Sequence, residues 1–360
     1  MHPKRKEQTR IQVPTLDSMV IFVFATLHLL AVLSLAYVLM SITPAKAAEG
    51  TACAGKNLLP QMEIDAPETY AKIESEGAIL ENGRSIFWKL EKAGIAPSYL
   101  LGTMHMSDPR VIAMPEGARQ AFDEAATLIL ESNEILDEKK ASVKLLATPD
   151  LMMFTDGKAI TDFLNPEQKQ LVEAALQKRG IPLLSVAKMK PWIISSFVAL
   201  PACELARKSS GAPFLDMKLA QDAKAAGKPI VGLETFKEQL ETMASLPFDF
   251  HVRSLVSTLK YADRTEDLME TLISLYQDGK TGWIMPLSRY AFEEDDQETD
   301  LMADFEKKMI TGRNHHMADR ALDTIAKGNA FMAVGALHLP GKEGLVELFR
   351  NQGYTVTSMK

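Results

Sequence analysis

Short apolar runs alternate with longer stretches of helical periodicity along this chain. The runs predict buried strands, because they are bounded by turn residues and rich in Val, Ile, Leu and aromatic residues. The first two runs flank a turn at residues 93–97 that contains a glycine and a proline, and they are predicted to form a hairpin. The predicted strands cover residues 85–90, 98–104, 127–130, 230–233, 330–336 and 354–357.

Helical periodicity fills most of the remaining chain. A strongly apolar helix is predicted from residue 192 to about residue 205. Thr235 and Glu238 have the spacing of a capping box, which predicts the start of another helix. Residues 248–327 are expected to be helical throughout, with Pro286 as one of the breaks.

Strands separated by helices predict an α/β fold (mixed α+β), in which a mixed central sheet is flanked by helices. Two largely helical stretches, around residues 133–210 and 248–327, predict a helical insertion in the middle of the domain. No low-complexity segment or composition break indicates a linker. Residues 48–360 are therefore expected to form a single domain.

The first 47 residues differ from the rest of the chain. Basic residues within positions 4–10 precede an uncharged apolar run at 19–40, and Ala45-Lys46-Ala47 follows it. This order is typical of a secretory signal, with cleavage expected after Ala47. The apolar run is also long enough to span a bilayer, so an uncleaved membrane anchor is the alternative. Both interpretations predict an exported protein, periplasmic or secreted, or anchored and facing outward.

The composition is 46% hydrophobic and 24% charged, which is ordinary for a globular protein with a sizeable core. The net charge of −7 becomes more negative without residues 1–47. It argues against a nucleic-acid partner, which requires a basic face. Cys53 and Cys203 both lie in the exported part, where an even pair predicts a disulfide. Two unpaired thiols are the alternative.

Four predicted strands each end in a residue that can bind a metal or move a proton: His105, Glu131, Glu234 and His338. Taken singly, such a histidine or glutamate is most often structural. Together they predict a site at one edge of the sheet, where α/β proteins bind their ligands. Two imidazoles and a carboxylate suit zinc, manganese, cobalt or iron, and the bound metal can activate a water molecule.

Arg313 and Asn314 lie on the helix that precedes the last buried strand. The arginine could clamp a carboxylate or an oxyanion, and the asparagine could donate to the same group. A surface arginine with a partner one helical turn away is the alternative. The chain has no Gly-x-Ser-x-Gly, His-Glu-x-x-His, P-loop, dinucleotide-binding or Cys-x-x-Cys motif, which excludes the commonest hydrolases, kinases and dehydrogenases.

Two Gly-x-x-His motifs, Gly102–His105 and Gly335–His338, resemble those of the TraB/PrgY/GumN family, which includes the Tiki metalloproteases. The surrounding residues 98–109 and 227–235 and the Arg313-Asn314 pair agree with this resemblance, which is closest to the GumN-like branch. It extends from about residue 53 to the C-terminus. The resemblance implies an EreA/ChaN-like mixed α/β fold, in which each half contributes one Gly-x-x-His.

For Tiki-like members the resemblance implies metal-dependent peptide hydrolysis, with His105, Glu234 and His338 as the metal centre. Glu131 and Arg313-Asn314 match further polar positions of the pattern, and a catalytic role is expected for Glu131, Glu234, Arg313 and Asn314. Relatives also include pheromone-shutdown proteins, and the wider fold includes an iron- or haem-binding lipoprotein.

Two functions follow from these observations. The first is an exported metal-dependent hydrolase, a peptidase that uses Mn, Co or Zn on a peptide or small-molecule substrate. The alternative is an envelope protein of the same fold that binds a peptide, a metal or haem without turning it over. A purely structural protein would be indicated if the four strand-end residues lay apart.

Overall fold

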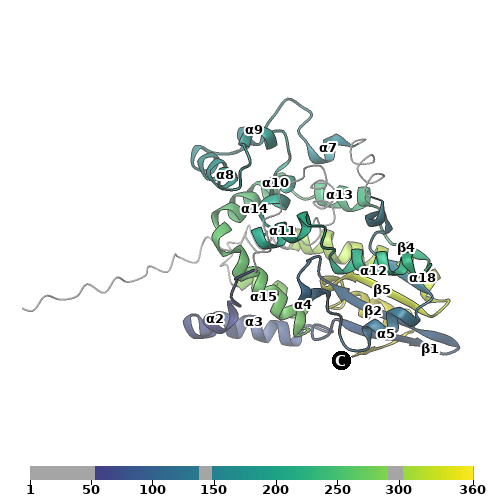
Figure 1. Cartoon of the computed structure of the whole chain (residues 1–360). Coiled ribbons are helices and arrows are strands. Elements are labelled where there is room, and N and C mark those ends of the chain that lie inside the picture. Colours follow the sequence, from purple (N-terminus) through teal and green to yellow (C-terminus); the bar gives the residue numbers. More distant parts are fainter. Residues whose placement is uncertain (1–52, 138–147, 291–302, 360) are drawn as a thin grey trace, which may run out of the picture.

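The computed structural model describes residues 53–137, 148–290 and 303–359. A six-stranded sheet lies between two sets of helices, and a larger group of helices stands beyond the sheet (Figure 1). The mixed α/β fold predicted from the sequence is confirmed. The predicted signal segment at 1–47, including the apolar run, lies outside the described residues.

The sheet has the strand order β4-β3-β5-β2-β1-β6. The first four strands in this order are mutually parallel, whereas β1 pairs antiparallel with both β2 and β6. Each predicted strand corresponds to one of these, with ends shifted by a few residues. The strands are β1 (Phe87–Lys92), β2 (Ile95–Thr103), β3 (Thr127–Leu130), β4 (Ile230–Gly232), β5 (Ala330–Gly335) and β6 (Thr355–Ser358).

The parallel pairing of β2, β3, β4 and β5 brings their carboxyl ends to one edge of the sheet. In the β2–β5 ladder, Gly102 pairs with Val334 and Thr103 with Gly335. The glycines of the two Gly-x-x-His motifs therefore lie one residue apart in register on neighbouring strands. This register carries the two histidines to the same region.

Helices make up most of the other described residues. The predicted capping box of Thr235 and Glu238 is confirmed, and Asn165 with Gln168 forms a second one. The helices are α2 (Leu59–Asp65), α3 (Pro67–Ile79), α4 (Pro109–Ile112), α5 (Ala118–Glu124), α7 (Pro149–Met152), α8 (Pro166–Lys178), α9 (Leu183–Val186), α10 (Pro191–Val198), α11 (Ala202–Ser209), α12 (Leu215–Ala225), α13 (Phe236–Ala244), α14 (Phe248–Lys260), α15 (Thr265–Gln277), α16 (Ile284–Tyr290), α18 (Gly312–Ile325) and α19 (Leu345–Asn351). Short 3₁₀ turns and one π-helical segment connect them: η2 (Asn133–Leu136), η3 (Ile160–Phe163), η4 (Ala262–Arg264), η5 (Thr281–Trp283), η6 (Glu306–Thr311, the π segment) and η7 (Ala336–His338).

Two predictions about helix breaks are wrong. The helix predicted over residues 192–205 is two helices, because Pro201 cannot donate a backbone hydrogen bond and starts α11. The expected break at Pro286 is absent, since this proline lies in the first turn of α16, where the missing N–H has no partner to lose.

Alternate residues of the strands pack on opposite faces of the sheet, as a period of two requires. On β5, Phe331 and Ala333 belong to the core under α5 and α12. Met332 and Val334 belong to the core under α18 and α19. A third apolar cluster holds α8, α10 and α14 together, away from the sheet. The sheet is thus buried on both sides, and its carboxyl edge faces the helical group.

The predicted disulfide is confirmed: Cys53 and Cys203 are bonded, with their Cα atoms 5.3 Å apart. The bridge joins the segment before α2 to α11. That segment is also tied to α15, because the Ala54 and Lys56 amides donate to side chains at its start. No helix within the described ranges is long and apolar enough to cross a membrane, and the 19–40 run lies outside them.

Candidate metal and hydrolase site

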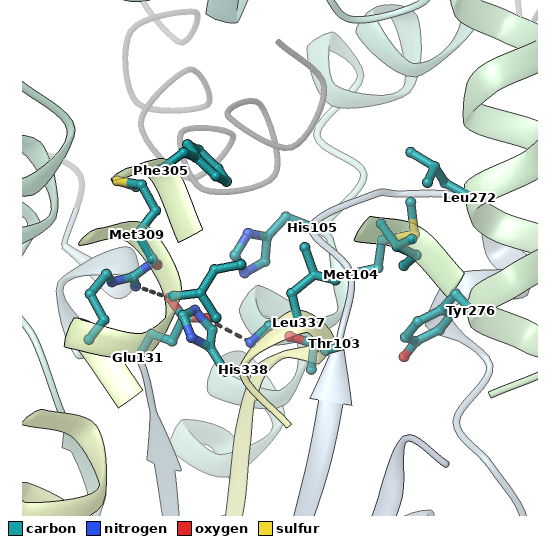
Figure 2. A pocket seen from close by; sticks show the side chains of 15 residues that line it. Thr103, Met104, His105, Glu131, Leu272, Tyr276, Phe305, Met309, Leu337 and His338 are labelled. Carbon is teal, nitrogen blue, oxygen red and sulfur yellow. Dashed lines mark hydrogen bonds and ion pairs between the residues drawn. The ribbon is translucent and has the colours of Figure 1, made fainter. Parts of the chain in front are cut away.

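A cavity of about 60 Å³ lies at the carboxyl edge of the sheet. Figure 2 shows His105, Glu131 and His338 around it, with Phe305 and Met309 on one wall. His105, Glu131 and His338 come from the ends of three parallel strands, whereas Arg313 and most apolar groups come from the helices that face the edge. The full lining is Thr103, Met104, His105, Glu131, Leu272, Tyr276, Ile284, Phe305, Met309, Ile310, Arg313, Gly335, Ala336, Leu337 and His338.

Both motif glycines lie in close contact with neighbouring groups. A Cβ atom at Gly102 would come within 2.9 Å of the Ala336 Cα atom on the neighbouring strand end. A Cβ at Gly335 would lie 3.1 Å from Glu131 Oε1. The glycine of each Gly-x-x-His motif therefore permits a close approach, of a neighbouring backbone at Gly102 and of the Glu131 carboxylate at Gly335. The histidine of each motif lines the cavity.

Hydrogen bonds determine which nitrogen of His338 carries a proton. The Asn314 amide donates through Nδ2 to the Glu343 carbonyl oxygen at 2.8 Å, so its Oδ1 atom must accept from His338 Nδ1 at 2.6 Å. Burial, reinforced by the charge of Arg313, lowers the pKa of His338 to about 3. The imidazole is therefore neutral, and its Nε2 atom presents a lone pair to the cavity.

Glu131 is a buried, ionised carboxylate. Burial raises its pKa, but the charge of Arg313, the two histidines and the hydrogen bond from the Gly335 amide together outweigh burial, so the pKa lies well below the usual range. Arg313 Nη2 donates to Oε2 at 2.6 Å, and the Gly335 amide donates to Oε1 at 2.6 Å. His338 Nε2 lies 3.8 Å from Oε1. Two electron-pair donors thus face one another without a proton between them.

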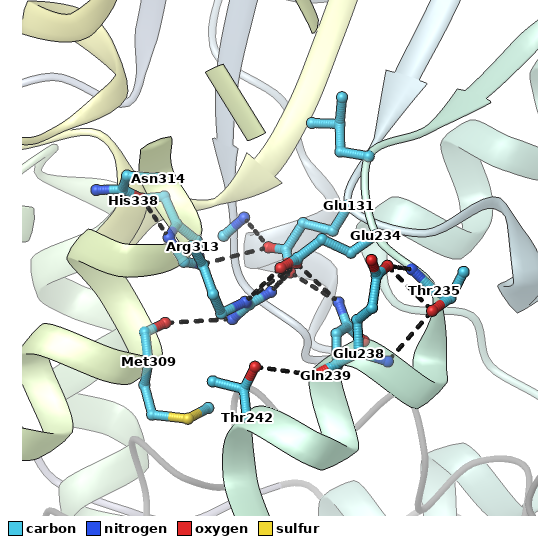
Figure 3. A network of polar contacts seen from close by, with 12 residues as sticks. Glu131, Glu234, Thr235, Glu238, Gln239, Thr242, Met309, Arg313, Asn314 and His338 are labelled. Atoms are coloured by element: carbon cyan, nitrogen blue, oxygen red, sulfur yellow. Dashed lines mark hydrogen bonds and ion pairs between the residues drawn. The ribbon is translucent and has the colours of Figure 1, made fainter. Parts of the chain in front are cut away.

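Arg313 also binds Glu234, and Figure 3 shows the guanidinium between the two carboxylates. Its Nη2 atom lies 2.6 Å from Glu234 Oε2, and its Nε atom donates to the same carboxylate at 3.0 Å. Gln239 donates to Glu131 at 3.3 Å. Glu234 does not line the cavity with the histidines; it lines a separate surface depression on the other side of Arg313, together with Lys308.

His105 is oriented by residues that sequence reasoning missed. Its Nε2 atom lies 3.5 Å from Oδ1 of Asp216, a buried aspartate on α12. The same oxygen accepts from Thr103 Oγ1 at 2.9 Å. The Phe214 ring packs edge-on against the imidazole, with the ring centres 5.4 Å apart. Asp216 shares one helix face with Leu219, Ala220 and Ala223, and an acidic residue on an apolar helix face is the signal that could have identified it.

The loop after His105 is held by a buried ionic group on α11. Glu204 is fully buried and accepts from the Ser107 amide at 2.6 Å. Lys208 donates to the His105 carbonyl oxygen at 3.3 Å. Burial lowers the pKa of Lys208 to about 8, although Glu204 opposes this shift. Because Cys203 precedes Glu204, the disulfide anchors the helix that supports this loop.

The structure brings His105, Glu131, His338 and Arg313 to one cavity, and Asn314 lies directly behind His338. Glu234 contacts Arg313 but faces away from the histidines. In the parts of the chain that the structure describes, no three His, Cys, Asp or Glu side chains are arranged to hold a metal ion.

The chemistry of one pair of donors fits a divalent ion. Zinc lies about 2.0–2.1 Å from a histidine nitrogen and about 2.0–2.2 Å from a carboxylate oxygen. One ion can therefore lie between His338 Nε2 and Glu131 Oε1, which are 3.8 Å apart. The Asn314 contact that fixes the His338 tautomer is of the kind that supports metal-binding histidines. His105 shares the same cavity and supplies a third donor of a suitable type.

Comparison with known proteins defines the class to which this fold and site belong. The model of the TraB/PrgY/gumN family matches residues 86–358, and the chain belongs to this family. The match includes all six strands and every residue of the candidate site. The resemblance that the Gly-x-x-His motifs indicated is therefore confirmed.

Individual relatives are more distant. The chain is 25% identical to Metalloprotease TIKI1 of Danio rerio over 317 residues, which cover 76% of this chain and 62% of the relative. It is 22% identical to Metalloprotease TIKI1 of Homo sapiens, over 76% of this chain and 61% of the relative. It is 24% identical to the uncharacterised protein YbaP of Shigella flexneri, over 70% of this chain and 88% of the relative. The chain thus spans about three fifths of the length of the TIKI relatives. No solved structure shows a significant match.

Proposed function

We propose that this chain is an exported metal-dependent hydrolase that cleaves peptide bonds. The observation that carries the proposal is the shared cavity in which His338 Nε2 and Glu131 Oε1 face one another as electron-pair donors. His105, His338 and Glu131 would hold a divalent ion, Mn, Co or Zn. When bound there, such an ion acidifies a coordinated water so that it can act as a nucleophile near neutral pH. The names of the TIKI relatives support this function.

The surrounding residues of the chain have positioning roles in this proposal. Asn314 accepts a hydrogen bond from His338 Nδ1 and leaves Nε2 free to bind. Arg313 keeps Glu131 ionised and holds it at the cavity. The low pKa of Glu131 makes it a weak base, which fits a ligand better than a proton acceptor. Glu234 holds Arg313 from the opposite side.

Export is part of the proposal and is supported by the Cys53–Cys203 disulfide, since disulfides persist in oxidising compartments. The basic and apolar N-terminal segment agrees with it. Attachment to a membrane through residues 19–40 remains the alternative mode of export. A peptide or another small molecule would be the substrate, and no nucleic acid is expected because of the acidic net charge.

The test compares the wild-type protein with His338→Ala and with His316→Ala, an exposed histidine on α18 that does not line the cavity. Each protein is treated with a chelator, supplied with Mn²⁺, Co²⁺ or Zn²⁺, and incubated with a peptide library. Metal content is measured in parallel, and products are identified by mass spectrometry. We expect metal-dependent cleavage by wild type and His316→Ala and none by His338→Ala.

Two results would contradict the proposal. Full cleavage by a folded His338→Ala protein would show that the cavity is not the reaction site. Metal binding or thermal stabilisation by peptide, metal or haem without any product would favour the alternative function, a binding protein of the same fold. Circular dichroism of each variant separates loss of activity from loss of folding.

A further inference from the structure

The cavity continues beyond the polar groups of the site into an apolar space. Its other walls are formed by Leu272 of α15, Phe305 and Met309 at the start of the helix that leads into α18, and Leu337 beside His338 (Figure 2). Leu272, Phe305 and Met309 are buried. One end of the cavity therefore carries the candidate chemistry, and the other end carries mainly apolar side-chain surface.

The one hydroxyl among the helical wall residues does not alter this character. Tyr276 donates its hydroxyl to the Gly102 carbonyl oxygen at 2.9 Å. Burial raises its pKa, with Asp216 adding to the effect, so the phenol stays neutral. A charged or strongly polar group placed at this end would lose its hydration without gaining a partner. The chemistry of the walls selects an apolar occupant.

The volume restricts that occupant further. An apolar protein cavity of roughly 150 Å³ holds a benzene molecule, and one water occupies about 30 Å³ in the liquid. The whole cavity, including the space beside the histidines, has a volume of about 60 Å³, so its apolar end is too small for an aromatic ring and has room for a group of a few carbon atoms at most. A packing defect in a core would be apolar all round, whereas this space ends at His105, Glu131, Arg313 and His338.

We propose that this space is the pocket for a short aliphatic side chain of the substrate, of the size of alanine or valine, next to the bond that is cleaved. Leu272, Phe305 and Met309 determine its depth. This inference rests on the proposed function and assigns its substrate class. Peptides with an aromatic or acidic residue at the same position would be excluded, the first by size and the second by desolvation.

The first experiment measures cleavage of peptides that differ only at the residue next to the cleaved bond, with Ala, Val, Phe or Asp there. The site of cleavage is first found with the library and then varied. We expect kcat/KM for Ala and Val to exceed that for Phe and Asp by about tenfold or more, the range that one or two methylene groups can produce in an apolar pocket. Cleavage of all four peptides at similar rates would overturn the inference while leaving the proposed function intact.

The second experiment enlarges the pocket. Leu272→Ala should improve the Phe peptide relative to the Val peptide by about tenfold. Leu275→Ala is the matched control, because Leu275 lies on the same helix and is equally buried but does not line the cavity. The Leu275→Ala variant should leave the ratio of kcat/KM for the Phe peptide to that for the Val peptide unchanged. Leu272→Val is the milder variant if Leu272→Ala does not fold. An unchanged ratio in a folded Leu272 variant would refute the assignment.

Direct binding separates this inference from the proposed function. Calorimetric titration of the same Val and Phe peptides into the wild type and the Leu272→Ala protein requires no turnover. Tighter binding of the Val peptide by wild type, with the preference reduced in Leu272→Ala, would support the pocket even if no peptide were cleaved. Equal or absent binding of both peptides to both proteins would overturn the pocket whether or not hydrolysis occurs elsewhere on the chain.

Discussion

Replacing Arg313 by methionine tests the ionic arrangement on which the site depends. The arginine is buried, and a single nitrogen, Nη2, lies 2.6 Å from both Glu131 Oε2 and Glu234 Oε2. Methionine has a similar length but no charge, so the change leaves two carboxylates buried without a cation. Breaking a buried ion pair in this way costs about 3–5 kcal/mol.

The control is Arg320→Met on the same helix. Arg320 pairs with Glu238 at 2.7 Å, but both side chains are close to half exposed. An exposed pair contributes about 1 kcal/mol or less. The two arginine variants remove the same charge from one helix, so the difference between them measures burial of the pair and not helix propensity.

The pH dependence of the free energy of unfolding should change in sign as well as in size when Arg313 is replaced. In wild type the depressed pKa of Glu131 contributes stability that is complete above its unfolded value of 4.5 and is lost as the pH falls below it. In Arg313→Met, burial without a cation raises the pKa of a carboxylate above 4.5. The folded variant then takes up a proton that the unfolded chain does not. Its stability should therefore increase as the pH falls from 7 toward 4.5.

Unfolding in guanidinium chloride, followed by circular dichroism between pH 4.5 and pH 7.5 under non-reducing conditions, measures both effects. We expect a loss of about 3–5 kcal/mol at pH 7 for Arg313→Met and about 1 kcal/mol or less for Arg320→Met. Adding Glu131→Gln and Glu234→Gln to Arg313→Met should restore part of the loss, because no buried charge then remains. An Arg313→Met protein as stable as Arg320→Met, or with the pH slope of wild type, would refute this account of the site.

Three further outcomes are expected. Reducing the Cys53–Cys203 disulfide opens a 150-residue loop, which should lower the free energy of unfolding by about 5 kcal/mol, measured by denaturation with and without reductant. Burial lowers the pKa of His251 to about 4, so the free energy of unfolding of the protein should fall by about 3 kcal/mol through this residue as the pH falls from 6.5 to 4. The His251→Gln protein should lose correspondingly less stability over that range, and equal losses in the two proteins would contradict the burial argument. Asp216→Asn should lower metal affinity by about 10–100-fold, measured by titration, whereas Asp222→Asn on the exposed side of the same helix should not.

The central strands could be predicted from the sequence because they are buried on both faces of the sheet. A strand such as β5, with every residue from Ala330 to Val334 buried, must be an uninterrupted apolar run, and such a run is visible without alignment. Its parallel partner β3, in which Leu128, Ile129 and Leu130 are all buried, follows the same rule. Strand order could not be predicted in this way, since the pairing of β5 between β3 and β2 depends on contacts far apart in sequence.

Helix breaks were harder to predict. The apolar character of residues 192–205 continues through Leu200-Pro201, so periodicity alone gives one helix. The missing N–H of Pro201 decides the outcome and separates α10 from α11. At Pro286 the same residue type has no effect, because it falls within the first turn of α16. The consequence of a proline depends on its distance from the helix start, which the sequence does not show directly.

The candidate site could be located in part. Strand ends are marked by the change from apolar to polar residues, and this change identified His105, Glu131 and His338. Asp216 could not be found by that rule, because it lies within α12 and meets His105 only through packing of the helix on the sheet. Sequence position also gave no means to distinguish Glu131 from Glu234, since both follow buried strands.

Arg313 is what makes these two glutamates different. Both carboxylates bind the same guanidinium, but Glu131 reaches it from β3, next to the Gly335 amide and His338, whereas Glu234 reaches it from the edge strand β4. Only the carboxylate beside β5 can present an oxygen to the cavity. Because β4 is the outermost strand, its end lies one strand further from the histidines. The strand order therefore assigns Glu131 to the cavity and leaves Glu234 to hold the arginine, and exchanging the two roles would require a different sheet.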